Sequence, residues 1–349
     1  MTSAGVSGRP AADEPRPRPR PTLANFWHPV AISSEVTEQP KQFELLGELI
    51  VLFRDSRGVA AFKDLCIHRG AALSLGWITD GRLTCAYHGW QYDRTGACVH
   101  IPSLPEGASI PRKARAIVYP ATEAYGMVWV AMDEPVQPIP PWPEYRVGGS
   151  ESRLFFIGRY EWKTSAGRAT ENGLDFSHFN HSHRGYLELA DGPVIKPHAV
   201  TESEYRLEYT YEDGDSRREY IVHSPFTVFI RKTGLPSRPG TGRTWDRDTT
   251  PVDGTTILAQ FASPIDETRT AVFAAIGRNH AFDVSDRDFA GGDWFETVLD
   301  QDRRVVESQR PERIPTDLRE ELHLKVPDAT GIAYRRMLAR IEGISYFMP

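Results

Sequence analysis

The chain has 349 residues, which is enough for two domains with substantial cores, and its 40% hydrophobic and 25% charged residues are ordinary for a globular protein. A net charge of −6 and a pI near 6.0 leave no basic surface, so nucleic acid is not expected as a partner. No apolar run approaches the roughly 18 residues that span a bilayer, so no membrane association is expected.

Residues 1–22 are predicted to be a disordered tail. They are rich in proline and arginine, as in Pro15–Pro21, and contain no apolar stretch that would form the core of a signal peptide. Three cysteines are too few for a disulfide framework, and we therefore expect a cytoplasmic protein.

Residues 23–134 are predicted to form a small all-β domain. Short β-type runs such as Glu48–Phe53 and Met127–Ala131 are separated by glycine and charged turn residues. Asp93–Gly96, which follows Trp90-Gln91-Tyr92, is typical of a hairpin turn.

Residues 135–150 are predicted to be a linker between two domains. Five prolines lie between Pro135 and Pro143, and proline continues neither a strand ladder nor a helix. We expect a flexible end of the linker near Gly148–Ser150.

Residues 151–349 are predicted to form an α+β domain, in which helices flank an antiparallel sheet with one buried face. The polar stretch 170–183 is expected to be helical because its polar residues recur at helical spacing. The expected strands are Leu154–Lys163, Tyr205–Tyr211, Tyr220–Lys232, Thr255–Ser263 and Thr270–Gly277, and the expected later helices are Asp293–Gln309 and Ile332–Ile341.

A first metal site is indicated by Cys66-Ile67-His68 and Cys85-Ala86-Tyr87-His88, with sixteen residues between His68 and Cys85. Two thiolates and two imidazoles are the ligands of either a zinc site or a mixed iron–sulfur cluster. Arg69-Gly70 follows the first motif and Gly89-Trp90 follows the second, and with them the segment resembles the Rieske [2Fe-2S] domain.

The resemblance implies that Cys66 and Cys85 bind one iron while His68 and His88 bind the other. Neutral imidazoles leave such a cluster less negative than an all-cysteine cluster, so that it accepts an electron more readily. Cys98 lies outside the motif and is expected to be a small buried residue.

A second metal site is indicated by Asn172, Asp175, His178 and His183, which stand as Asn-x-x-Asp-x-x-His-x-x-x-x-His. With a Rieske domain upstream, the chain from Phe26 onward resembles the Rieske non-haem iron oxygenases, whose catalytic domain is helix-grip-like. In that family the two histidines of this motif bind a mononuclear iron, which implies His178 and His183 here. His181 does not fit the pattern and is expected to be solvated or to support the ligands through hydrogen bonds.

The resemblance also implies a carboxylate that completes a 2-His-1-carboxylate triad and leaves positions open for dioxygen. Family members take it from a late helix, and Asp302 fits best because Glu307 follows it in an Asp-x-x-x-x-Glu pattern. Asp300 is two positions away and would point to another face of the helix.

Asp175 has a different implied role. In the related oxygenases a carboxylate at this position joins an iron-bound histidine to a Rieske histidine of the neighbouring subunit. Here Asp175 would join His178 to the His88 of a neighbour, which implies a homotrimer. Asn172 is expected to support the catalytic site.

The principal hypothesis is the terminal oxygenase component of a monooxygenase or demethylase. A nucleotide-binding glycine loop and a ferredoxin-type set of four cysteines are not found, so electrons are expected from a separate NAD(P)H-dependent reductase, with or without a ferredoxin. A ring cis-dihydroxylating dioxygenase is the alternative within the family. A Rieske electron carrier and a zinc-stabilised binding protein are the alternatives from other classes.

The substrate is only loosely constrained by the sequence. Aromatic residues in Phe226–Ile230 and Gln260–Ala262 would either line a pocket for an apolar or polycyclic compound or, as we favour, pack in the sheet core. The segment Leu235–Asp253 is predicted to be a long loop of the kind that often covers an active site.

Overall fold

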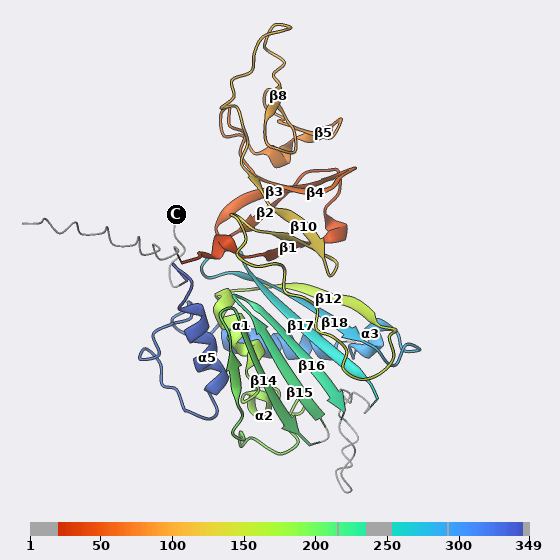
Figure 1. The fold of residues 1–349 in the computed structure, drawn as a ribbon, viewed down its shortest axis with the longest axis vertical. Coiled ribbons are helices and arrows are strands. Elements are labelled where there is room, and N and C mark those ends of the chain that lie inside the picture. The colour runs from red at the N-terminus through yellow and green to blue at the C-terminus, as the bar shows by residue number, and fades with distance from the viewer. Residues whose placement is uncertain (1–19, 215, 235–252, 292, 345–349) are drawn as a thin grey trace, which may run out of the picture.

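The computed structural model describes residues 20–344 except 215, 235–252 and 292 (Figure 1). Most of the predicted tail, and the predicted loop Leu235–Asp253 apart from Asp253, therefore lie outside the described residues. Within the described part of the chain, no helix is long and apolar enough to cross a membrane.

The N-terminal part is built only from short antiparallel strands and three short 3-10 helices, as the sequence predicts. One sheet joins β1 (His28–Ile32), β11 (Met127–Val130) and β10 (Ala121–Ala124). A second joins β2 (Lys41–Leu45), β3 (Glu48–Asp55), β4 (Gly58–Lys63) and β9 (Val118–Tyr119), and a third joins β5 (Trp77–Thr79), β6 (Arg82–Thr84), β7 (Gln91–Tyr92) and β8 (Cys98–His100). The 3-10 helices are η1 (Leu23–Asn25), η2 (Ser33–Glu35) and η3 (Leu73–Leu75).

The predicted turn at Asp93–Gly96 is confirmed between β7 and β8. The Gly96 N–H donates to the Asp93 carbonyl at 2.9 Å, and Gly96 has a φ of +80°, which glycine adopts without strain. The Asp93 side chain also accepts the Thr95 and Ala97 N–H groups, so the turn is closed by its own aspartate.

The C-terminal part is organised around a seven-stranded antiparallel sheet in the order β12-β18-β17-β16-β15-β14-β13 (Figure 1). Its strands are β12 (Arg153–Trp162), β13 (Val200–Glu202), β14 (Arg206–Asp213), β15 (Ser216–His223), β16 (Thr227–Gly234), β17 (Thr255–Pro264) and β18 (Thr270–Arg278).

The prediction that Tyr220–Lys232 is a single strand is wrong. β15 ends at His223 and β16 begins at Thr227, so the segment is a hairpin that turns at Ser224-Pro225-Phe226. Pro225 has no N–H with which to continue a ladder, and this physical signal lies within the sequence.

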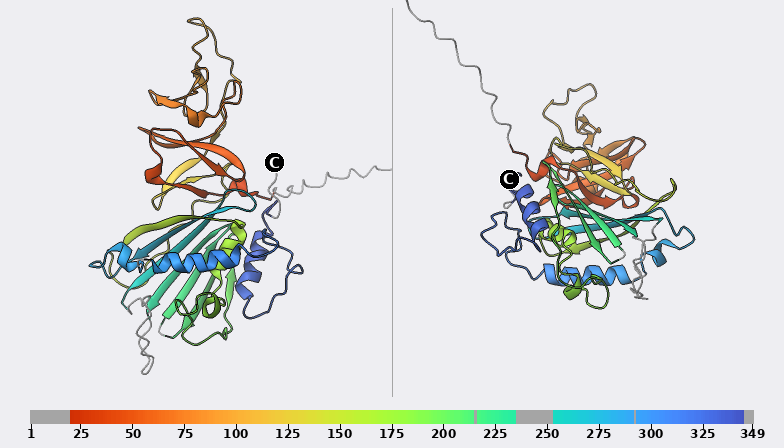
Figure 2. Two further views of the ribbon diagram at one scale, coloured as in Figure 1. Left: turned by 180° about the vertical axis from the view of Figure 1, so that it is seen from behind. Right: turned by 60° about the horizontal axis from the view of Figure 1, so that its bottom comes forward.

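The central strands are buried on both faces, so the expectation of one buried face holds only toward the edge. Along β14 buried residues alternate with more exposed ones, whereas every residue of β18 is buried. One face of the sheet packs against α1, α4 and α5, and Figure 2 shows α4 lying across it. The other face packs against the N-terminal part, where Trp129 of β11 contacts Phe261 at a ring distance of 5.2 Å.

The helices are α1 (Ala166–Leu174), α2 (Phe179–Ser182), α3 (Asp286–Phe289), α4 (Trp294–Val306) and α5 (Ala329–Leu338). The predicted late helices are confirmed as α4 and α5, with ends displaced by a few residues. The prediction of one helix over 170–183 is wrong in its middle, because α1 ends at Leu174 and the backbone is extended at Asp175.

Residues 135–150, the predicted linker, contain no helix or strand, and they contact residues of both halves of the chain. The Val136 N–H donates to the Asn25 carbonyl at 3.0 Å, and the Trp142 ring contacts Phe229 at 5.4 Å. Near the expected flexible end, the Val147 carbonyl accepts the Thr255 hydroxyl at 3.0 Å. The linker is therefore tied to both halves of the chain.

Candidate metal centres and adjoining cavity

The two Cys/His loops have matching backbone conformations. The Gly70 N–H donates to the Cys66 carbonyl at 2.8 Å, and the Gly89 N–H donates to the Cys85 carbonyl at 3.0 Å. Both glycines have φ near +70°, a conformation that other residues adopt only with strain. Each loop therefore carries its cysteine and histidine in an equivalent position.

The thiols and the imidazoles of these loops form two separate pairs. Cys66 and Cys85 are buried at 2% and 1% exposure. The His68 and His88 Nδ1 atoms lie 3.2 Å apart nearer the surface, and the Trp90 ring stacks on His68 at 4.5 Å. Cys98 is buried outside the loops, as expected. Two thiols inside and two imidazoles outside fit a [2Fe-2S] cluster with one iron on each pair.

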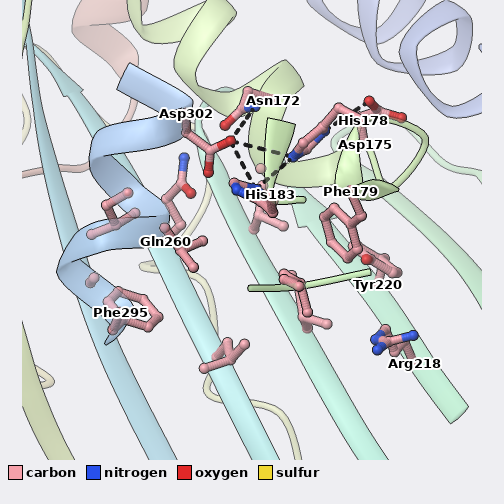
Figure 3. Close-up of a pocket in the computed structure, with 18 of the residues that line it drawn as sticks. Asn172, Asp175, His178, Phe179, His183, Arg218, Tyr220, Gln260, Phe295 and Asp302 are labelled. Atoms are coloured by element: carbon pink, nitrogen blue, oxygen red, sulfur yellow. Dashed lines mark hydrogen bonds and ion pairs between the residues drawn. The ribbon is translucent and has the colours of Figure 1, made fainter. Parts of the chain in front are cut away.

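The second site is assembled at the ends of α2 and on one face of α4. His178 and His183 flank α2, and Asp302 lies in α4 (Figure 3). The His178 and His183 Nε2 atoms are 3.2 Å apart, and the Asp302 Oδ1 atom lies 3.3 Å and 3.1 Å from them. Their ligand atoms all lie within 4.8 Å of one another, which suits one metal ion.

The other ring nitrogens of the two histidines are already occupied. His178 Nδ1 lies 3.0 Å from an Asp175 carboxylate oxygen, and His183 Nδ1 lies 2.9 Å from the Gln301 amide oxygen. Because both partners accept hydrogen bonds, each ring carries a proton on Nδ1, so Nε2 is the atom that would bind a metal.

The electrostatics of the site favour a bound cation. Burial opposes a charge on His178, but Asp175 and Asp302 outweigh it and raise the pKa of the imidazole to about 9. Burial likewise disfavours the Asp302 carboxylate, but hydrogen bonds with His178 and His183 lower its pKa to about 2. A site that holds a proton this firmly without metal has the charge distribution that a divalent cation requires.

Gln301 contacts the candidate ligand His183 and was not identified by the sequence analysis. Replacing it with alanine is expected to weaken mononuclear iron binding by about 10- to 100-fold, because the His183 ring loses the acceptor that orients it. Iron titration of the apo-site would measure the change. Arg304→Ala, at an exposed position of the same helix, serves as the control, and equal affinity in Gln301→Ala would contradict the role.

Asn172 lies where it can hold the candidate ligand Asp302. Its amide donates to Asp302 Oδ1 at 3.1 Å, from α1 to α4. The other two groups considered from the sequence lie elsewhere: Asp300 forms an ion pair with Arg303 on the exposed side of α4, and His181 is exposed. The structure thus brings Asn172, but not Asp300 or His181, to the three candidate ligands His178, His183 and Asp302.

The helices around the site are fixed by buried ion pairs. Arg335 of α5 contacts Glu171 of α1 at 2.6 Å and Glu321 at 2.6 Å, and Arg168 also pairs with Glu321. Arg168 and Arg335 are almost fully buried. These contacts fix α1, and with it Asn172, against the rest of the domain.

A cavity opens beside the three candidate ligands, between the sheet, α4 and the segment around α2 (Figure 3). The sheet lines it with the apolar residues Val228, Ile230, Leu258, Ala259 and Ala274 and with the polar residues Arg218, Tyr220, Lys232 and Gln260. Phe229 and Phe261 belong to the opposite face and pack against the N-terminal part, so our preference for sheet core over pocket is confirmed for them. Gln260, whose amide donates to the Ala169 carbonyl at 2.8 Å, was missed, although a glutamine within an apolar strand is a visible signal.

Two family models match the chain. Residues 26–118 match the Rieske [2Fe-2S] domain, and residues 162–342 match the vanillate O-demethylase oxygenase C-terminal domain. The first match contains the two Cys/His loops, and the second contains all three candidate ligands of the mononuclear site.

Individual relatives agree with these matches over nearly the whole chain. Methylxanthine N1-demethylase NdmA of Pseudomonas putida is 30% identical over 344 residues, which cover 93% of this chain and 90% of the relative. Methylxanthine N3-demethylase NdmB of the same species is 30% identical over 309 residues, covering 84% and 83%. A solved structure of an NdmA mutant with caffeine has a TM-score of 0.78 at 29% identity and covers 90% of this chain and 89% of its own.

Proposed function

The chain belongs to the Rieske non-haem iron oxygenases, and from this premise we propose that it is the terminal oxygenase that hydroxylates or oxidatively demethylates an apolar, aromatic or polycyclic small molecule. Members of the family are oxidoreductases that incorporate oxygen, and they carry a Rieske cluster and a mononuclear iron. The demethylase relatives favour this reaction over ring cis-dihydroxylation.

In this proposal Cys66, His68, Cys85 and His88 hold the cluster, and the triad of His178, His183 and Asp302 holds the iron. The chemistry that these groups supply when bound is dioxygen activation, in which one oxygen atom enters a substrate C–H bond and the other leaves as water. When the oxidised carbon is a methyl group on oxygen or nitrogen, the hydroxymethyl product would break its C–O or C–N bond, release formaldehyde and leave the proton on the heteroatom, so that the net result is demethylation.

The observation that carries the proposal is the placement of the triad in the cavity wall. The three side chains are partly or fully buried and line the same space as Val228, Ile230 and other apolar residues. That wall would hold a carbon skeleton against the open side of the triad and exclude water from it. Asp175, Asn172 and Gln301 would keep the ligands oriented while substrate enters.

Electron supply is proposed to come from a separate NAD(P)H-dependent reductase, with or without a ferredoxin. The strands β5 and β8 beside the Cys/His loops lie at one end of the molecule, and α2 lies near the other end (Figure 1). Because this separation is unsuited to direct transfer within one chain, we propose a homotrimer in which the loops of one subunit face Asp175 of the next. Both surfaces are accessible in the single chain: Tyr87 is 60% exposed and the Asp175 side chain is 29% exposed.

The direct test is the metal content of anaerobically purified protein. About three irons and two acid-labile sulfides per chain, with a visible spectrum that bleaches with dithionite, are expected. Chelation should remove the single mononuclear iron first. Zinc without sulfide would refute the oxygenase assignment, and two irons that stay at two after iron is added back would leave only an electron carrier.

A further inference from the structure

The sheet side of the cavity is arranged in rows that follow from the strand register. Nearest the triad, Val228 stands opposite Gln260, and Gln260 stands opposite Ala274. In the next row Tyr220 stands opposite Ile230, and Ile230 stands opposite Leu258. In the third row Arg218 stands opposite Lys232. Figure 3 shows Arg218 beyond Tyr220, on the side away from the triad.

The two ends of the cavity therefore differ in charge. Among the described residues that line it, the carboxylates are Asp175 and Asp302, both at the triad. The far row contains two cationic side chains, Arg218 and Lys232, which are only 4% and 3% exposed. An end of a cavity that is lined by cationic side chains attracts anions.

One such anion is Asp213, but it engages only part of the Arg218 guanidinium. Arg218 Nη1 donates to Asp213 Oδ2 at 3.1 Å, and the two Asp213 oxygens also accept the backbone N–H groups of Ala190 and Asp191 at 2.9 Å each. Arg218 Nε is buried without a hydrogen-bond partner among the described residues. A charged donor in the cavity wall thus retains hydrogen-bonding capacity.

The Tyr220 hydroxyl is a second donor of this kind. Tyr220 is fully buried, its ring stacks on Tyr209 at 4.6 Å, and its hydroxyl has no hydrogen-bond partner in the described part of the chain. Burial raises the pKa of the phenol, so the hydroxyl keeps its proton. Tyr220 and Arg218 are two residues apart on β15, so their side chains leave the same face about 7 Å apart along the strand.

We propose that Tyr220 and Arg218 form an anion subsite at the end of the cavity remote from the triad, and that it binds the carboxylate of the substrate. This inference rests on the proposed function and narrows its substrate class to an aromatic or polycyclic acid. Ile230 and Leu258, which share the middle row with Tyr220, would contact the carbon skeleton. The carboxylate would thereby fix which carbon of the acid lies beside His178, His183 and Asp302.

A ligand-binding role is favoured over a purely structural one because the Tyr220 hydroxyl and Arg218 Nε lack hydrogen-bond partners among the described residues. A buried donor without a partner is destabilising, so an acceptor that reaches it is bound more tightly. The two donors lie on one face of β15, in the wall of the cavity beside His178, His183 and Asp302. A single carboxylate has two oxygens and would accept a hydrogen bond from each donor.

The test is equilibrium binding to the iron-loaded, full-length protein under anaerobic conditions. The probes are a methoxy-substituted naphthoate and its carboxamide, which share shape and differ in charge. Hydrogen bonds to a charged group should favour the acid by about 10- to 100-fold. Binding is followed calorimetrically, so the measurement requires no turnover and no reductase.

Tyr220→Phe is the decisive variant, because the hydroxyl that it removes has no partner in the free protein. It should leave thermal stability unchanged or slightly raised. It should lower the binding affinity of the acid by about 10-fold and that of the carboxamide much less. Tyr334→Phe is the matched control: its buried hydroxyl donates to the Pro225 carbonyl at 2.9 Å away from the cavity, so it should lower stability and keep the acid preference. Arg218→Gln should remove the preference, although loss of its contact with Asp213 is expected to cost stability as well.

Equal affinity for acid and carboxamide, no measurable binding of the acid, or an unchanged preference in Tyr220→Phe would each overturn the subsite. None of these outcomes bears on the iron and sulfide content. Failure of the subsite can therefore be told apart from failure of the proposed oxygenase function.

Discussion

Asp302→Ala is expected to empty the mononuclear iron site while the visible spectrum of the Rieske cluster survives. Asp302 Oδ1 lies within 3.3 Å of both imidazole nitrogens, and Asp302 is the proposed third ligand of the iron. Loss of a residue that orients a ligand typically lowers metal affinity by about 10- to 100-fold. Loss of a ligand itself should lower the affinity by more than this. Product formation should fall with the iron content, which metal analysis of the purified variant would show.

The control for this experiment lies two residues away on the same helix. Asp300 pairs with Arg303 on the exposed side of α4, so Asp300→Ala should retain about three irons per chain and normal turnover. The opposite pattern, with iron lost from Asp300→Ala and kept in Asp302→Ala, would move the third ligand to Asp300. Because both variants remove one carboxylate from α4, a general loss of helix stability would affect them alike.

The residues proposed as ligands could be predicted from sequence because each set is local or has a distinctive spacing. Cys66 and His68 sit in one tight loop, as do Cys85 and His88, and His178 and His183 flank one short helix. The sequence also indicated the late helix that carries Asp302, since α4 has regularly spaced apolar residues. The break in the polar stretch was harder to foresee, because Asp175 leaves the helix to accept hydrogen bonds from Ser177 and to contact His178.

The cavity wall and the packing of the sheet could not be predicted from sequence, because they depend on pairings between distant segments. Whether Arg218 faces a cavity or solvent is decided by the register of β15 against β16, and one residue of slip would reverse it. The two buried faces of β18 reflect packing by the N-terminal part, which alternation within one strand does not reveal. Gln301 has no sequence signal, because an amide on a helix is usually solvated.

Asp175→Asn is expected to abolish most reductase-driven turnover while both metal sites stay filled. An asparagine amide oxygen can still accept from His178 Nδ1, at present 3.0 Å from the carboxylate, so the ring orientation and the iron should be retained. What is lost is the negative charge and the second acceptor, which the proposed trimer needs to join His178 to the neighbour's cluster. Stopped-flow reoxidation of the reduced cluster by dioxygen and substrate should slow by about 100-fold or more, the cost typical of a misplaced reacting partner.

The electron-transfer role can be separated from a role in iron chemistry by changing the source of electrons. Hydrogen peroxide brings oxygen that is already reduced by two electrons, so product formed with peroxide does not depend on the cluster. If Asp175 serves transfer between subunits, Asp175→Asn should keep peroxide-driven activity and lose reductase-driven activity. Asp317→Asn, an exposed carboxylate that pairs with Arg319, should keep both. Equal loss of both activities in Asp175→Asn would assign the carboxylate to the iron site alone, and normal reoxidation of the cluster would remove its bridging role.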